Sequence, residues 1–130
     1  MIVVDASALV DTLLREPGAA HLEQLLFDPN RTFHAPHLLD VEVAHAIRRH
    51  AIAGVIDDER GRMALDDLAD FPLRRYPHDF LLPRAWSLRA NMSVYDAVYV
   101  ALAEVLNAPL LTRDQRLAAA ARQHADIEVI

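Results

Sequence analysis

The sequence predicts one α/β domain, residues 1–130, with a central, mainly parallel sheet of five strands flanked by helices. Five short apolar runs alternate along the chain with longer segments of helical character. Strands separated by helices are typical of parallel sheets with right-handed crossovers. The chain has 130 residues, of which 53% are hydrophobic, and this is enough to build the core of one ordinary domain.

The expected strands are delimited by polar residues and prolines. Asp5 ends the first, β-branched run, Pro72 and Pro77 bracket the third strand, and Pro109 leads into the fourth. The expected strands are residues 2–4, 32–34, 73–76, 110–112 and 127–130.

The expected helices are delimited by turn sequences and capping residues. Glu16-Pro17-Gly18 stops the first helix, and Asp28-Pro29-Asn30 closes the second. Pro36 opens a long third helix that ends at Gly54, and Asp57 caps the fourth. The expected helices are residues 6–15, 19–27, 36–53, 58–69, 80–89, 94–106 and 115–124.

The composition excludes several classes of chemistry. The chain has no cysteine, which excludes disulfides, thiolate zinc sites and cysteine nucleophiles. All 13 basic residues are arginine, so mechanisms that require a lysine, such as Schiff bases and P-loop phosphate grips, are excluded too. The net charge of −6 disfavours general nucleic-acid binding, and any such role must use localised arginines or bound cations.

The sequence predicts a cytoplasmic protein with no membrane contact. No apolar run approaches the roughly 20 residues that a membrane span needs. The first residues carry no basic segment, and Asp5 interrupts their apolar stretch, so they do not resemble a signal peptide.

Four acidic residues fall where the expected sheet has the carboxyl ends of its strands. Asp5 ends the first strand, and Asp114 follows the fourth. Glu42 lies in the second turn of the helix after the second strand, and Asp96 lies in the first turn of the helix that leads to the fourth. Ligands bind at this edge of an open α/β sheet, so the four carboxylates are expected to converge on one site.

An ordinary structural role competes with this interpretation for three of the four acids. Asp5 and Asp114 stand at N-cap positions, and Asp96 completes a capping box that begins at Ser93. Glu42 is one turn too deep to cap its helix, and Asp96 lies in a helix that is apolar nearly all round. A buried carboxylate without a partner is costly, so the joint pattern favours a site.

Four clustered carboxylates repel one another and take up protons unless a cation keeps them ionised. Oxygen ligands without histidine or cysteine suit Mg²⁺ or Mn²⁺. These ions activate water and stabilise charge in phosphodiester hydrolysis. The acids therefore predict a metal-dependent hydrolase.

The segments that carry the four acids resemble the acidic motifs of PIN-domain ribonucleases. They read VVDASAL at the start, LLDVEVAHAIRR in the third helix, and SVYDAVYVALAE and LLTRD near the end. Their order and spacing are most similar to the VapC-type toxins of bacterial toxin–antitoxin pairs, and the resemblance covers essentially the whole chain. It implies a PIN-like three-layer fold, Mg²⁺ or Mn²⁺ dependence, endonucleolytic cleavage of RNA, a homodimer and neutralisation by a cognate antitoxin.

Carried over by position, the resemblance makes the four acids the catalytic, metal-binding cluster. Ser7 and Thr112 match the family's small hydroxyl positions beside it. The metal ligands are then Asp5, Glu42, Asp96 and Asp114. Asp11 and Asp40 are ambiguous, and neither is placed among the ligands.

The arginines nearest in sequence to the candidate acids are expected to act differently from the others. Arg113 and Arg116 flank Asp114, so they are the expected RNA contacts. The pairs Arg48-Arg49 and Arg74-Arg75 are expected to be solvated.

Other functions fit parts of the pattern. A metal-independent ribonuclease would use a histidine pair, for which His34, His37 and His45 lie near the expected edge. A receiver-like regulatory domain needs a lysine that this chain lacks, and a phosphatase of the haloacid dehalogenase kind needs a second aspartate where Asp5-Ala6-Ser7 has a serine. The remaining alternative is a non-cleaving PIN module that acts through protein binding.

Overall fold

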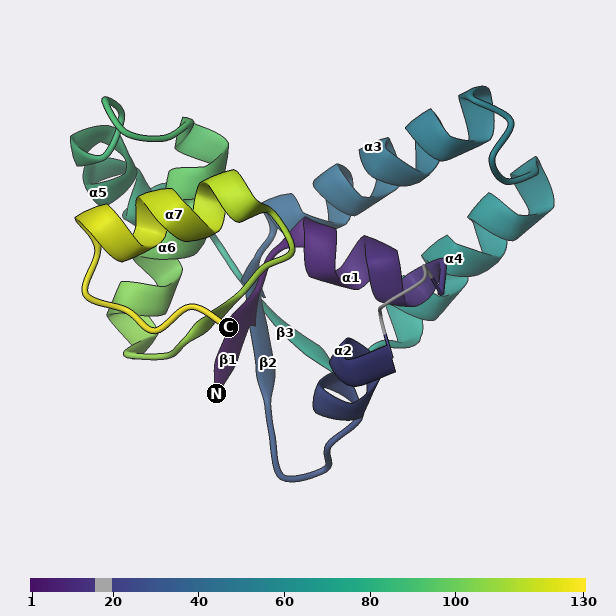
Figure 1. Ribbon diagram of the computed structural model, residues 1–130, viewed down its shortest axis with the longest axis horizontal. Helices are drawn as coiled ribbons and strands as arrows, with labels where there is room; N and C mark the ends of the chain where they lie inside the picture. Colours follow the sequence, from purple (N-terminus) through teal and green to yellow (C-terminus); the bar gives the residue numbers. More distant parts are fainter. Residues whose placement is uncertain (16–19) are drawn as a thin grey trace.

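The computed structural model describes residues 1–15 and 20–130, and within them it contains one parallel sheet of four strands (Figure 1). The strand order is β3-β2-β1-β4, and each neighbouring pair is parallel. The strands are β1 (Ile2–Val4), β2 (Phe33–Pro36), β3 (Leu73–Tyr76) and β4 (Leu110–Leu111). The α/β class and the parallel sheet are therefore as predicted.

The expected fifth strand, residues 127–130, is wrong as a full strand. Only an isolated parallel bridge joins Leu110 to Val129, although the amide of Leu110 donates to Glu128 at 2.9 Å and that of Ile130 donates to Leu110 at 2.8 Å. The neighbouring strand β4 has only two residues, so it offers few backbone groups for hydrogen bonds to the C-terminal segment. The segment follows the sheet edge without completing a ladder.

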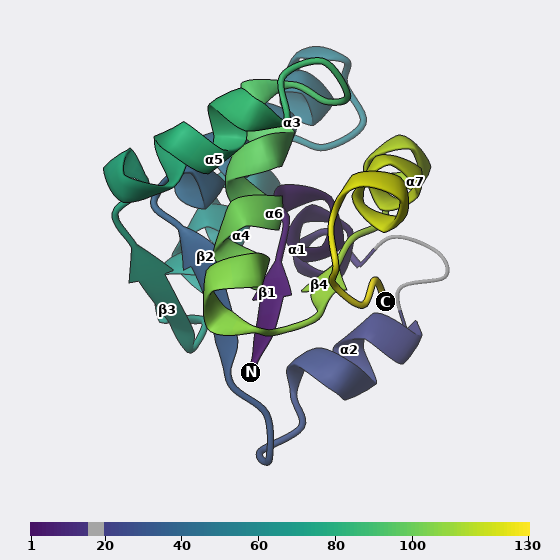
Figure 2. The same ribbon diagram turned by 90° about the vertical axis from the view of Figure 1, so that its left-hand side faces the viewer.

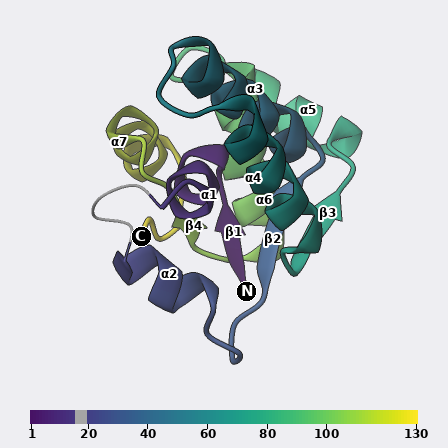
Figure 3. The same cartoon turned by 90° about the vertical axis from the view of Figure 1, so that its right-hand side faces the viewer.

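Helices cover both faces of the sheet and give three layers (Figures 1, 2 and 3). On one side α6 packs on β1 and β2, and α5 packs on α6. On the other side α1, α3 and α4 contact one another. The helices are α1 (Ala6–Leu13), α2 (Ala20–Leu26), α3 (Leu38–Ile52), α4 (Asp58–Asp70), the 3-10 turn η1 (Asp79–Leu81), α5 (Leu82–Ser87), α6 (Val94–Leu106) and α7 (Gln115–His124).

Most predicted helix boundaries agree with the structure. Helices α6 and α7 have the predicted bounds, and Asp57 caps α4 by accepting the amide of Arg60 at 2.7 Å. Pro36 does not open α3 as predicted. It is the last residue of β2, and α3 begins at Leu38. The predicted helix at 80–89 divides into η1 and α5, and the turn Glu16-Pro17-Gly18 lies outside the described residues.

The strands, α1, α2, α3, α4 and α6 all contribute to one hydrophobic core, and α6 supplies its longest buried run. Residues 97–103 of this helix are all buried, and they include Tyr99 and Leu102. Burial of this kind stabilises the folded state by about 25 cal/mol per Å² of apolar surface. The packing of α6 therefore fixes the position of Asp96, which lies in its first turn. No helix in the described residues is long and apolar enough to cross a membrane.

Candidate active site

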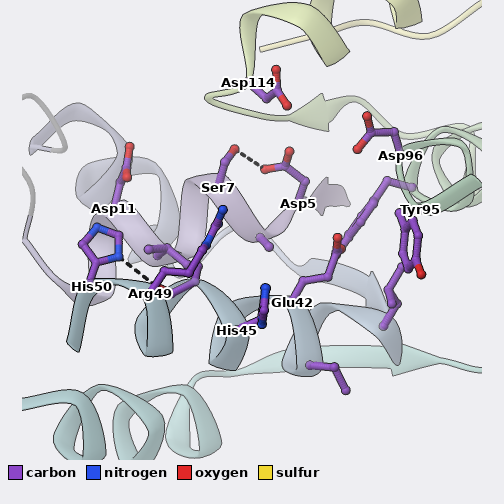
Figure 4. Close-up of a pocket in the computed structure, with 16 residues that line it drawn as sticks. Asp5, Ser7, Asp11, Glu42, His45, Arg49, His50, Tyr95, Asp96 and Asp114 are labelled. Carbon is purple, nitrogen blue, oxygen red and sulfur yellow. Dashed lines mark hydrogen bonds between the residues drawn. The ribbon is translucent and has the colours of Figure 1, made fainter. Parts of the chain in front are cut away.

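A cleft of about 640 Å³ opens where α1, α3, α6 and α7 begin, at the carboxyl end of the sheet (Figure 4). All four candidate acids line it, and each comes from a different element. They are Asp5 at the end of β1, Glu42 on α3, Asp96 on α6 and Asp114 at the start of α7.

The carboxylate of Asp5 is held in the cleft by three hydrogen bonds. Its side chain is buried, since the residue is 5% exposed. The Oδ1 atom accepts the Ser7 hydroxyl at 2.6 Å and the Ala8 amide at 3.2 Å, and Oδ2 accepts the Thr112 hydroxyl at 2.5 Å. The carboxylate is therefore fixed in one orientation.

Ser7 and Thr112 connect this carboxylate to the loop that carries Asp114. The Thr112 hydroxyl accepts the amide of Asp114 at 3.0 Å, and the Ser7 hydroxyl accepts the amide of Arg113 at 2.9 Å. Two segments separated by about a hundred residues in sequence are thus joined through two small hydroxyls.

Glu42 is held by a tyrosine that the sequence analysis missed. The hydroxyl of Tyr99 donates to Oε1 of Glu42 at 2.5 Å, and Tyr99 is 2% exposed. Tyr99 follows Asp96 by three residues on α6, so both lie on the same face of the helix. That spacing places Tyr99 on the face of α6 that carries Asp96, but it does not by itself indicate the contact with Glu42.

Asp5 and Asp114 also cap helices, as the structural interpretation of the sequence expected. Asp5 caps α1, and Oδ1 of Asp114 accepts the amides of Arg116 at 2.9 Å and Leu117 at 3.2 Å. Both carboxylates line the cleft at the same time. The capping role and the site role are therefore compatible.

The electrostatics of the cleft show that the acids influence one another. Burial is the main cause that raises the pKa of Asp5, Glu42 and Asp96 above their ordinary values. Neighbouring negative charge raises these pKa values further: Asp114 acts on Asp5 and Asp96, and Asp96 and Asp5 act on Glu42. The Tyr99 hydrogen bond opposes the rise at Glu42.

The donor set is suited to a hard divalent cation. It consists of carboxylate oxygens, which Mg²⁺ and Mn²⁺ prefer, and a cation would relieve the repulsion between them. Within the described part of the chain, however, no three His, Asp or Glu side chains stand close enough together to enclose one ion. A metal would have to draw the carboxylates inward.

The two ambiguous aspartates have different surroundings. Asp40 makes a two-pronged ion pair with Arg75, at 2.7 Å and 3.0 Å, and does not line the cleft. Asp11 lines the cleft, and its Oδ2 atom lies 3.1 Å from Nε of Arg113.

The expected RNA contacts of Arg113 and Arg116 stay a prediction. Neither Arg113 nor Arg116 is among the residues that line the cleft, although the charge of Arg116 acts on Asp96. Arg49, from one of the two arginine pairs expected to be solvated, is exposed and lines the cleft.

Only one of the three candidate histidines lines the cleft. This is His45, and His50 from the same helix lies there too. His34 is instead buried, with hydrogen bonds to Tyr76 at 2.6 Å and Thr32 at 2.9 Å.

Comparisons with known proteins agree with this geometry. Residues 2–123 match the family model of the PIN domain. The chain is 45% identical over 129 residues to Ribonuclease VapC1 of Mycobacterium tuberculosis, covering 98% of this chain and 96% of that protein. It is 41% identical over 130 residues to Ribonuclease VapC12 of the same species, covering 100% and 99%.

A solved structure supports the fold independently. The crystal structure of VapBC2 from Rickettsia felis, bound to a DNA fragment from its promoter, matches with a TM-score of 0.72 at 14% identity, over 100% of this chain and 98% of that chain. The chain therefore belongs to the PIN-domain family and, within it, to the VapC ribonucleases. The expected class, an RNA-hydrolysing enzyme of the toxin type, is confirmed.

Tyr99→Phe tests whether the buried hydroxyl positions Glu42. The variant keeps the ring and removes only the hydrogen bond, so we expect RNA cleavage to fall by about tenfold, the scale typical of groups that orient metal ligands. Because that bond lowers the pKa of Glu42, its loss should also move the acidic limb of the pH–rate profile to higher pH.

Tyr76→Phe is the matched control, since its hydroxyl bonds His34 away from the cleft. Equal losses in the two variants, with no change in either pH profile, would contradict a positioning role for Tyr99.

Proposed function

We propose that this chain is a metal-dependent endoribonuclease and the toxic component of a toxin–antitoxin pair. The observation that carries the proposal is the convergence of four carboxylates from four elements on one cleft, in a member of the VapC ribonucleases. The substrate is RNA, and the cofactor is Mg²⁺ or Mn²⁺.

The four acids are the proposed ligands of this cation. Asp5 and Asp96 hold it principally, and Glu42 and Asp114 complete the set directly or through water. When bound, the cation supplies Lewis acidity for the attack of water on the phosphodiester. Ser7 and Thr112 keep Asp5 in place, and Tyr99 keeps Glu42 in place.

We further propose a cytoplasmic homodimer that a cognate antitoxin neutralises. The antitoxin is supported by structural neighbours that are themselves toxin–antitoxin assemblies, such as VapBC2. Self-association is supported by large apolar side chains that lie exposed on η1 and α5, where Phe80 is 52% and Trp86 is 62% exposed.

The proposal is tested by expressing the chain with and without the open reading frame beside it. Alone, it should arrest growth and produce discrete fragments in total RNA, and the neighbouring product should restore both. Growth arrest with intact RNA would instead favour a non-cleaving PIN module that acts through protein binding. Normal growth and intact RNA would contradict the toxin assignment altogether.

A further inference from the structure

One face of α3 runs along the whole cleft, and its residues change from acidic to basic. Glu42, His45, Ala46, Arg49 and His50 all line the cleft, at spacings of three and four residues that place them on one side of the helix. Figure 4 shows Arg49 on the same side of the acids as His50 and Asp11, with Tyr95 on the opposite side. The acidic centre is thus continued along α3 by two histidines and one arginine, Arg49, on the side where Asp11 pairs with Arg113.

Arg49 is the only arginine among the described residues that line the cleft. Its side chain is exposed, and it makes no ion pair within 4.0 Å with any carboxylate in the described part of the chain. Arg113, by contrast, is engaged with Asp11. A guanidinium with no carboxylate partner among the described residues, beside a site for phosphodiester chemistry, is available to an external anion.

The position of Arg49 fits a phosphate next to the reacting one. Glu42 and Arg49 are seven residues apart on α3, which is two turns and roughly 10 Å along the helix axis. The two side chains therefore leave α3 two turns apart, so a strand that enters the acidic centre and follows α3 also passes Arg49. Guanidinium groups match phosphate oxygens with two parallel hydrogen bonds, which gives direction as well as affinity.

We propose that Arg49 binds a backbone phosphate of the RNA that neighbours the phosphate to be cleaved, and so directs the strand along α3. This inference rests on the proposed ribonuclease function. His45 lies one turn closer to the acids and borders the same path. Since phosphate contacts carry no sequence information, Arg49 sets the position of the RNA and not the choice of cleavage sequence.

Direct binding tests this role in an Asp5→Asn background, where cleavage is expected to be lost. The probe is a fluorescently labelled single-stranded oligoribonucleotide of mixed sequence, titrated in Mg²⁺ at several salt concentrations. Arg49→Ala should weaken binding by about tenfold. It should also make the slope of log Kobs against log salt shallower by about 0.7, the value for one lost contact to a single strand.

Two further variants separate charge from geometry. Arg48→Ala is the matched control, because Arg48 is the exposed neighbour on α3 that does not line the cleft, and it should change neither affinity nor slope. Arg49→Lys keeps the charge and loses the two-pronged contact, so it should keep the slope and lose part of the affinity. Melting temperatures of all variants check that they fold.

Kinetics with Asp5 intact distinguish this inference from the function on which it rests. Arg49→Ala should raise KM for RNA by about tenfold and leave kcat within about twofold. If the unmodified protein cleaves RNA but Arg49→Ala and Arg48→Ala bind it alike, the inference is overturned and the ribonuclease stands. It is overturned too if Arg49→Ala weakens only binding of the co-encoded partner protein. A chain that cleaves no RNA in Mg²⁺ or Mn²⁺ overturns both.

Discussion

Replacing Asp5 or Asp96 by asparagine is expected to lower RNA cleavage by roughly two to three orders of magnitude, the scale on which loss of a preorganised charge acts in an active site. Each change keeps the shape of the side chain and removes one negative charge from the cleft. Toxicity should fall with the activity. The measurement is the rate of fragment formation from total RNA, with growth followed in parallel.

The same variants should not unfold the protein, and Asp96→Asn should stabilise the metal-free form. Burial and Asp114 raise the pKa of Asp96, so the folded protein binds this proton more tightly than the unfolded chain does. The free energy of unfolding therefore decreases as pH rises from the ordinary value of 3.8 through the raised pKa. Asparagine carries no charge and so avoids the cost of ionising this buried carboxyl group. In EDTA at neutral pH, Asp96→Asn should therefore have a higher melting temperature than the unmodified protein.

Asp5→Asn should gain less stability in EDTA than Asp96→Asn. The Asp5 carboxylate accepts the hydroxyls of Ser7 and Thr112, and an amide nitrogen cannot accept the second of these bonds. Asp58→Asn, at an exposed position on α4, is the control for loss of charge alone and should leave cleavage unchanged. If both cleft variants keep full activity and only melt earlier, the acids are helix caps and nothing more.

Removal of divalent cations is expected to abolish cleavage, and Mg²⁺ or Mn²⁺ should restore it. Without a cation the clustered carboxylates repel one another, and this repulsion adds to burial in raising the pKa of Asp5, Glu42 and Asp96. The measurement is cleavage of total RNA in EDTA, followed by readdition of each metal.

His45→Ala is the informative companion to the EDTA experiment, since His45 is the predicted histidine that lies in the cleft. It should leave the dependence on metal intact. Full activity in EDTA, lost on changing His45, would instead support the metal-independent histidine mechanism.

The fold was largely predictable because its signals are local. β-Branched runs, prolines and capping aspartates mark most element boundaries, and α6 and α7 have the predicted ends. The fifth strand was not predictable, because its formation depends on how many residues β4 offers for pairing, and β4 has only two. The apolar character of residues 127–130 does not show how many residues of β4 are available for pairing.

The convergence of the four acids was predictable from topology, since each lies just after a strand or in the first two turns of a helix that begins at one edge of the sheet. The contacts between side chains were not. Tyr99 appears in the sequence as one more apolar residue of α6, and its hydroxyl meets Glu42 only after α3 and α6 pack. The sequence likewise does not show that Arg113 pairs with Asp11 while Arg49 lines the cleft, because both depend on where Asp11 lies in the folded chain.

Calorimetric titration of the metal-free protein with Mn²⁺ tests the central claim, that the four carboxylates form one cation site. The unmodified chain should bind Mn²⁺ with measurable heat at neutral pH, and Asp58→Asn should match it. Asp5→Asn and Asp96→Asn should each bind at least about tenfold more weakly, because each loses a ligand charge. Identical binding curves for all four proteins would contradict the account.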